Sequence, residues 1–149
     1  MTIQLYVNKA PYEVNVRPDE YLIETLRKLR FLSVKKGCDT TSCGVCTVLV
    51  DGKPVASCSY LSGRAQGHEI TTVEGIYEEA TLLSTFMGKE GSDQCGYCNP
   101  GFALTVFSMK EHLVSPTTEE IKNYLVGNLC RCSGYLGQEI AIKNYLGVK

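Results

Sequence analysis

The sequence predicts an α+β protein in which a strand-rich first half is followed by a helical second half. Three observations support this prediction. Residues 1–75 contain two hairpin patterns around one helical pattern, residues 76–149 contain only helical patterns, and each half holds four of the eight cysteines. A mixed sheet built from two hairpins and one helix is of the β-grasp kind, so we expect two small domains, one per half.

The first half alternates strand and turn signals around a single helix. Strands are indicated by side chains that alternate between apolar and polar, and the helix by Leu and Ile that recur at helical spacing. In order, we expect a hairpin over 3–16 with its turn at 8–11, a helix over about 19–30, a hairpin over 47–58 with its turn at 51–53, and a strand over 70–73.

The second half carries four helical patterns. Asn99 and Pro100 indicate a helix start, with the asparagine as the cap and the proline at the first helical position. Thr117 and Glu120 have the spacing of a capping box, which opens another helix. The expected helices are a short one around 82–86, one from Asn99 to about Leu113, one containing 121–125 and a last one containing 140–146.

Composition and charge exclude several classes of protein. The net charge is −1 and no long run of Lys or Arg is present, so nucleic acid is not an expected partner. No stretch approaches the roughly 20 apolar residues that cross a bilayer, and no signal peptide is apparent at the amino terminus. We therefore expect a cytoplasmic protein without a membrane partner, whose cysteines bind metal or do redox chemistry.

The first group of cysteines has the spacing C-x4-C-x2-C-x11-C and consists of Cys38, Cys43, Cys46 and Cys58. This is the spacing of a plant-type [2Fe-2S] loop, in which three cysteines wrap the cluster and a fourth follows later. Gly37 and Gly44 permit the close backbone approach that such a loop needs. A four-cysteine zinc site is the alternative, but zinc sites usually combine paired C-x2-4-C knuckles and only Cys43 and Cys46 resemble one.

The second group combines C-x2-C with C-x-C and consists of Cys95, Cys98, Cys130 and Cys132. The C-x2-C alone is also typical of a thioredoxin-like redox pair. The second close pair, together with the first group, favours a second cluster whose ligands meet where the helices pack. Arg131 lies between two of these cysteines, either to offset the negative charge of a thiolate-bound cluster or as a structural salt-bridge partner. We find no acid–base pair or nucleophile, and expect no catalytic residue on this chain.

Three segments resemble the iron–sulfur subunit of the molybdenum hydroxylases, the family of xanthine dehydrogenase and aldehyde oxidase. They are residues 37–48 (GCDTTSCGVCTV), 94–101 (QCGYCNPG) and 127–135 (GNLCRCSGY), and the resemblance covers essentially the whole chain. It implies an N-terminal β-grasp plant-type ferredoxin domain over 1–75 and a C-terminal four-helix domain over 76–149, each binding one [2Fe-2S] cluster. Asn99 and Ser133 stand where the family usually has Thr. Gln138 stands where it usually has an aliphatic residue, so the resemblance does not predict how the last helix packs.

The resemblance implies an electron-transfer role within a complex. In this family a substrate is hydroxylated at a molybdenum–molybdopterin centre on a large subunit, and electrons pass through the helical-domain cluster and the plant-type cluster to FAD on a medium subunit. It also implies that Gln94 contacts the molybdopterin, that Cys132 lies near the pterin, and that the complex dimerises. A xanthine- or purine-type heterocycle is the expected substrate, and nicotinate, aldehydes, carbon monoxide and aromatic acyl-CoA are the alternatives within the family.

Two alternatives lie outside this family. A free-standing soluble ferredoxin-like electron carrier needs only the first 75 residues, so the helical half favours a chain that docks on a pterin site. A zinc-stabilised interaction module would be colourless and would lack labile sulfide. For Gln94, the structural alternative to a pterin contact is a hydrogen bond at a helix end.

Overall fold

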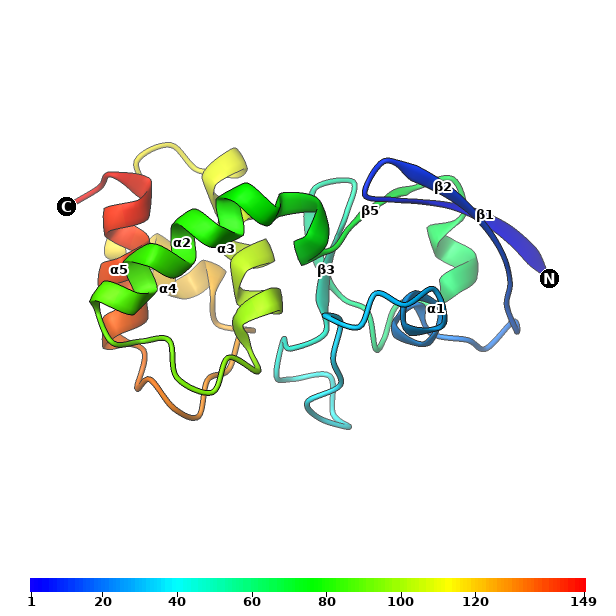
Figure 1. Cartoon of the computed structure of the whole chain (residues 1–149), viewed down its shortest axis with the longest axis horizontal. Helices are drawn as coiled ribbons and strands as arrows, with labels where there is room; N and C mark the ends of the chain where they lie inside the picture. Colours follow the sequence, from blue (N-terminus) through cyan, green and yellow to red (C-terminus); the bar gives the residue numbers. More distant parts are fainter.

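The computed structural model describes residues 1–149 and confirms the α+β class. Two parts lie along the long axis of the molecule, with the N-terminus at one end and the C-terminus at the other (Figure 1). We call them the sheet half, which contains β1–β5 and α1, and the helical half, which contains α2–α5. No helix is both long enough and apolar enough to span a membrane.

A mixed five-stranded sheet of order β2-β1-β5-β3-β4 forms the sheet half. Both expected hairpins are confirmed, since β1 pairs antiparallel with β2 and β3 pairs antiparallel with β4. β5 joins the two hairpins, because it runs parallel to β1 and antiparallel to β3. The strands are β1 (Thr2–Val7), β2 (Ala10–Asn15), β3 (Thr47–Val50), β4 (Lys53–Ala56) and β5 (Glu69–Thr71).

Helix α1 (Leu22–Lys28) is shorter than expected and covers the sheet with Leu22 and Leu26, which are fully buried against strand residues such as Leu5. Glu20 lies before the helix rather than in its first turn. Its side chain is fully buried, and its carboxylate accepts hydrogen bonds from Thr25 Oγ1 at 2.7 Å and Lys28 Nζ at 2.6 Å. From the sequence, Glu20 is expected to favour the start of the helix as an acidic residue. In the structure it is instead the centre of a group of buried polar contacts.

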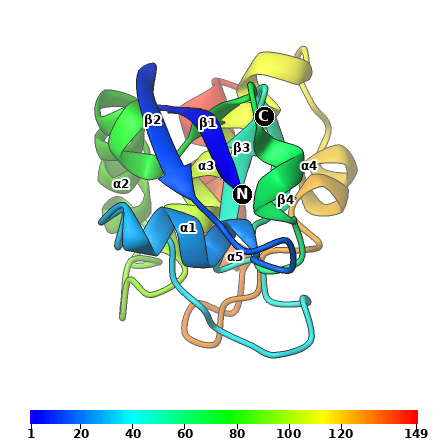
Figure 2. The ribbon, with the colours of Figure 1, turned by 90° about the vertical axis from the view of Figure 1, so that its right-hand side faces the viewer.

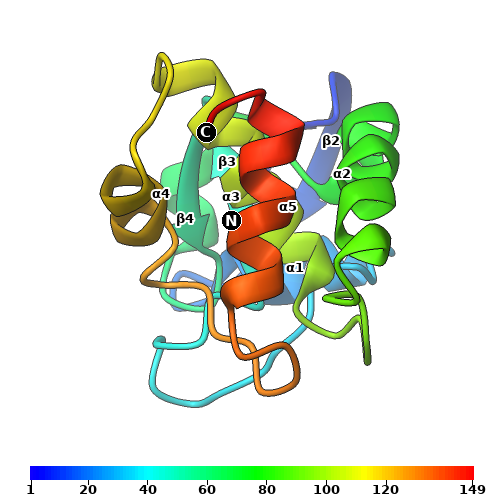
Figure 3. The same ribbon diagram turned by 90° about the vertical axis from the view of Figure 1, so that its left-hand side faces the viewer.

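Four helices form the other half: α2 (Tyr77–Lys89), α3 (Asn99–His112), α4 (Thr118–Tyr124) and α5 (Leu136–Leu146). α5 lies between α2 and α4 when the molecule is viewed from the helical end (Figure 3). The expected short helix around 82–86 is longer, because it follows directly on a 3-10 turn at Val73–Ile76. The capping box is confirmed: Thr117 Oγ1 accepts from the Glu120 N–H, and the Thr117 N–H donates to Glu120 Oε2.

The start of α3 corrects one prediction. Cys98, not Asn99, is the N-cap residue, and it makes no side-chain capping bond. The chain turns into the helix one residue early, because Gly96 has a positive φ of 75° and its carbonyl accepts the Asn99 N–H. The Asn99 side chain instead donates to Asp93 Oδ1 at 2.8 Å, which fixes the loop that precedes the helix.

The last helix packs closely against the helical half, although Gln138 stands where the family usually has an aliphatic residue. α5 begins at Leu136, and Ala141 and Ile142 are fully buried in the core of the helical half together with Phe102 of α3. Gln138 itself is buried on this inner side of the helix, with 4% of its surface exposed. The polar residue is thus accommodated inside the fold rather than turned to the solvent.

Helix α3 joins the two halves. A small apolar core of Leu49 from β3, Ile76 and Leu104 from α3 lies at the junction, and Ser108 Oγ donates to the Gly52 carbonyl at 2.9 Å. Near the start of α3, a Cβ on Gly101 would lie 2.5 Å from the Gly44 carbonyl oxygen, so only glycine permits this approach. The junction fixes the loop of the first cysteine group against α3, the helix that follows the C-x2-C of the second group.

Candidate iron–sulfur sites

The cysteine loops of both halves gather at one edge of the molecule. In Figures 1 and 2 the cyan loop before β3 and the orange loop before α5 both lie at the lower edge, and the green loop between α2 and α3 lies near them in Figure 1. The fold thus brings together segments that are far apart in the sequence. These loops contain seven of the eight cysteines, and Cys58 follows β4.

The first site is built on the sheet. Cys46 immediately precedes β3 and is buried, while Cys38, Cys43 and Cys58 are half-buried. Ser57 tightens the arrangement, because its hydroxyl and its backbone N–H both donate to the Cys46 carbonyl. The spacing predicted these four cysteines as ligands, and the fold brings Cys38 beside Cys43 and Cys46 beside Cys58.

The electrostatics of the first site favour a thiolate at its rim. Backbone N–H groups of Cys43, Thr40 and Ser42, with the neighbouring Cys43 thiol, lower the pKa of Cys38 to about 6. Burial and the neighbouring Cys58 thiol raise the pKa of Cys46 to about 11. At neutral pH the inner thiol therefore keeps its proton unless a bound metal displaces it.

The second site is assembled from two loops. Cys95 and Cys98 come from the turn before α3, and Cys130 and Cys132 from the turn before α5. All four line one pocket of about 350 Å³. Burial and the neighbouring Cys130 raise the pKa of Cys98 to about 12, so this thiol also depends on a metal for its deprotonation.

Cys130 has the opposite pKa shift. Burial acts to raise its pKa, but the Ser133 hydroxyl and the N–H groups of Ser133 and Cys132 outweigh burial and lower it. The Ser133 N–H lies 3.4 Å from Cys130 Sγ. Ser133, one of the departures from the family pattern, thus keeps a hydroxyl beside the thiol that it supports.

Within each site the thiols lie in pairs. Cys38 neighbours Cys43 and Cys46 neighbours Cys58 in the first site, while Cys98 neighbours Cys130 and Cys95 neighbours Cys132 in the second, close enough for each pair to interact. A [2Fe-2S] cluster has two irons and four cysteine ligands, so two thiols per iron are required. A structural zinc site needs four ligands converging on one ion. Such pairs supply the two donors per iron that a diiron cluster in each half would need.

Gln94 lies at the open side of the second site. Its side chain is exposed and Nε2 donates to the Cys132 carbonyl at 3.4 Å, and Cys95 and Cys132 are exposed beside it. The structure thus brings Gln94 and Cys132 together at this face. Arg131 is exposed and forms no ion pair within the chain.

The two sites touch through hydrogen bonds to backbone carbonyls of the first loop. The Leu129 N–H donates to the Cys43 carbonyl at 2.9 Å, and Asn128 Nδ2 donates to the Gly44 carbonyl at 3.4 Å. Gly44 has a positive φ of 69°, and a Cβ there would clash with the Gly127 carbonyl oxygen. Sequence reasoning assigned Gly44 to the wrapping of the first loop and missed this contact, since no sequence signal pairs Gly44 with Gly127.

Comparison with known proteins finds an iron–sulfur domain in each half. A family model described as "2Fe-2S iron-sulfur cluster binding domain" matches residues 5–72, and one described as "[2Fe-2S] binding domain" matches residues 72–143. The xanthine dehydrogenase iron-sulfur-binding subunit of Escherichia coli O157:H7 is 42% identical over 139 residues, which are 91% of this chain and 87% of the relative. This chain belongs to the iron–sulfur subunits of the molybdenum hydroxylase family.

Other members of this family show the same likeness along the whole chain. The nicotinate dehydrogenase small FeS subunit of Eubacterium barkeri is 38% identical and covers 96% of this chain and 93% of its own. The structure of quinoline 2-oxidoreductase from Pseudomonas putida 86 matches with a TM-score of 0.89 at 34% identity, covering 98% of this chain and 93% of that chain. As a family member, the chain is an iron–sulfur subunit of an oxidoreductase.

The family fold also occurs inside longer chains. The aldehyde oxidoreductase from Desulfovibrio desulfuricans matches with a TM-score of 0.89 at 32% identity, and the match covers 98% of this chain but 17% of that chain. In that protein the equivalent of both halves is therefore one part of a much longer polypeptide.

Proposed function

We propose that this chain is the electron-transfer subunit of a molybdenum hydroxylase. It would dock with a large subunit that holds molybdenum–molybdopterin and with a medium subunit that holds FAD. The proposed ligands are Cys38, Cys43, Cys46 and Cys58 for a plant-type [2Fe-2S] cluster, and Cys95, Cys98, Cys130 and Cys132 for a second one. When bound, each cluster takes up and releases one electron at a time, which connects a two-electron oxidation to a flavin.

The contact between the two cysteine loops is the observation that supports this proposal most directly. The hydrogen bond from the Leu129 N–H to the Cys43 carbonyl joins a residue of the first site to the residue before Cys130 of the second. Cys43 also lines the pocket that the second four cysteines surround. A chain that holds two redox sites in direct contact is built to pass electrons between them.

The exposed residues of the two sites support a direction of electron transfer through the chain. At the second site Gln94, Cys95 and Cys132 are exposed, and we propose that this face meets the molybdenum subunit, with Gln94 in contact with the molybdopterin and Cys132 near the pterin. At the first site the rim formed by residues 40–42 is exposed, and it would face the flavin subunit. Cys46 lies on the buried side, toward the sheet.

The finer assignments rest on the family. We propose that the domains divide near residue 75, that the complex is cytoplasmic, and that it dimerises. We also propose a xanthine- or purine-type substrate, which the 42% identity to a xanthine dehydrogenase subunit supports. Relatives named for nicotinate, nicotine and caffeine are 37–38% identical, so nitrogen heterocycles are the wider class to screen.

The test is a native anaerobic purification through a tag on this chain, with iron, labile sulfide, molybdenum and flavin quantified in the eluate. About four irons per chain, with molybdenum, flavin and two larger co-eluting chains, is the expected result. A substrate screen on the same sample then assigns the heterocycle. Iron and sulfide on a chain that elutes alone would contradict the subunit role and favour a free carrier, while zinc without sulfide would favour an interaction module.

A further inference from the structure

Gln138 is a buried polar residue for which the fold provides no partner. It lies on the inner side of α5, one turn before the fully buried Ile142. Its Nε2 atom exposes less than 1 Å² and is the only buried side-chain nitrogen or oxygen in the chain without a hydrogen bond. Leaving such a group unpaired costs on the order of 1–3 kcal/mol, so a donor in this position calls for an acceptor.

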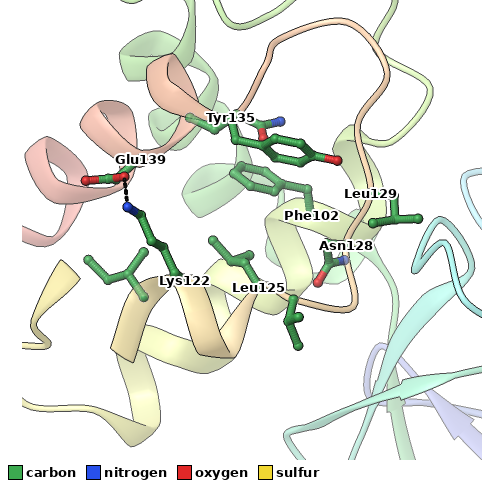
Figure 4. A pocket seen from close by; sticks show the side chains of 10 residues that line it. Phe102, Lys122, Leu125, Asn128, Leu129, Tyr135 and Glu139 are labelled. Atoms are coloured by element: carbon green, nitrogen blue, oxygen red, sulfur yellow. Dashed lines mark ion pairs between the residues drawn. The ribbon is translucent and has the colours of Figure 1, made fainter. Parts of the chain in front are cut away.

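The surroundings of Gln138 contain cysteine sulfurs. With Cys98 and Cys130 it lines a narrow crevice that has no room for a water molecule. Gln138 also borders the larger pocket of about 420 Å³ in Figure 4, where Phe102, Leu129 and Tyr135 lie on one side and the ion pair of Lys122 and Glu139 on the other. Water in that pocket does not reach Nε2, because the atom is enclosed.

Two backbone acceptors and one thiol in the narrow crevice already have partners. The Cys43 carbonyl accepts from Leu129, and the Gly44 carbonyl accepts from the backbone and the hydroxyl of Thr47 as well as from Asn128. The Cys43 thiol pairs with Cys38 in the first site. The sulfurs of Cys98 and Cys130 line the same crevice, and they are the acceptors of the second site that a bound metal would convert to thiolates. A thiolate accepts but does not donate, so the nitrogen of the amide is the end that belongs beside it.

We propose that Gln138 Nε2 donates a hydrogen bond to sulfur of the iron–sulfur cluster in the helical half and raises the reduction potential of that cluster. The inference rests on the proposed cysteine ligands. Reduction adds negative charge to the cluster, and an N–H donor stabilises the more negative form. The buried amide lines the crevice with Cys98 and Cys130, which are less exposed than Cys95 and Cys132, so it acts on the less solvated part of the site.

The test compares Gln138→Met with Ile142→Val in the purified complex. Methionine preserves the length of the side chain but removes the donor, and the Ile142 variant perturbs the packing of the same helix without touching the donor. For Gln138→Met we expect the ratio of reduced to oxidised helical-half cluster at a fixed ambient potential to fall about tenfold, which corresponds to about 59 mV for a one-electron couple. The signal of the plant-type cluster and both signals of Ile142→Val should titrate as in the wild type.

A second readout does not depend on the Met variant folding. Glutamine labelled with ¹⁵N in its side-chain amide should give a nitrogen coupling in the pulsed EPR spectrum of the reduced helical-half cluster. Measuring it in a Gln94→Ala background removes the other glutamine of the helical half, since Gln4 and Gln66 belong to the sheet half. Two cluster signals without this coupling, or with a potential that Gln138→Met leaves unchanged, would overturn the inference alone. A wild-type chain without a second cluster signal would instead overturn the proposed function.

Discussion

The first site takes three of its cysteines from one continuous loop, whereas the second takes two from each of two loops that precede α3 and α5. The first loop leads into a sheet with its own core, and Ser57 fixes its innermost cysteine. The loop that carries Cys130 is instead held by hydrogen bonds from Leu129 and Asn128 to the first site. The sheet half thus positions part of the helical site, and we expect the two sites to differ in how they respond to substitution.

The largest effect is expected from Gly44→Ala, which breaks the contact on which the comparison depends. Alanine at this positive φ would be strained and its Cβ would clash with the Gly127 carbonyl. We expect a loss of about 3 kcal/mol or more in the free energy of unfolding, together with a loss of iron from the helical site. Thermal unfolding and iron content of the purified complex measure both.

Gly52→Ala is the matched control for Gly44→Ala. Gly52 has a similar positive φ of 79°, but nothing lies within 4 Å of the position of its Cβ. It should cost only the backbone strain, about 1 kcal/mol, and leave the iron content unchanged. Equal effects of the two variants would show that strain, not the contact between the loops, matters at Gly44.

A pair of cysteine variants separates the two sites. In the reduced complex Cys43→Ser should remove one of two EPR signals and Cys98→Ser the other, because each cluster requires all four of its thiolates. The backbone of Cys43, which holds Leu129, is unchanged in the first variant. If both signals survived in either variant, the corresponding group of four cysteines would be wrongly assigned.

Gln94→Ala tests the exposed side of the helical site. The side chain reaches only the Cys132 carbonyl within the chain, so both cluster signals should remain while turnover falls by about tenfold or more, as expected for a lost contact to a cofactor. Steady-state kinetics and EPR on the same sample measure the two quantities. Gln66→Ala, an exposed glutamine of the sheet half, is the control. Turnover equal to that of the control would return Gln94 to a purely structural role.

The smallest effect concerns the sheet half alone. Burial acts to raise the pKa of Glu20, but the hydrogen bonds from Lys28, Thr25 and the Arg17 N–H lower it below its usual value. The carboxylate therefore contributes stability that is fully present above the unfolded-state pKa of about 4.3 and is lost as the pH falls through the lower folded-state value. Glu20→Gln should lower the free energy of unfolding by about 1–2 kcal/mol at pH 7.

The decisive observation is how the stability difference between wild type and Glu20→Gln changes with pH. The difference between wild type and Glu20→Gln should shrink as the pH falls below about 4, whereas Glu13→Gln on the exposed side of β2 should differ little from wild type at any pH. Denaturant unfolding at several pH values, followed by a spectroscopic signal of the sheet half, measures this difference. A difference that stayed constant with pH would mean that Glu20 acts through packing rather than charge.

The same contrast explains what the sequence could predict. The first site is local, so the spacing of its cysteines and the hairpin patterns around it were enough to predict the fold and to propose the ligands. The second site depends on how α3 and α5 pack, so its spacing alone also fitted a redox pair, and it was proposed from its spacing together with the first group and from the resemblance. Contacts between segments far apart in the sequence, such as Gly44 with Gly127, leave no local pattern and were missed.

Two polar residues show more clearly what the sequence alone could not predict. Glu20 follows a proline near a helix start, where acidic residues are common, and only the packing of α1 on the sheet shows that it is buried. Gln138 was visible as a departure from the family pattern, but the direction of its amide depends on the positions of α3 and α5. Burial of a polar group is a tertiary property, and propensity gives no signal for it.

The most direct test of two paired-thiol sites on one chain is a spin count on the reduced wild-type complex, combined with iron and sulfide analysis of the same sample. The expected result is two distinct EPR signals that together account for about two spins per chain, with about four irons and four sulfides. A single signal with about half of the iron would contradict the assignment of one cluster to each half of the molecule.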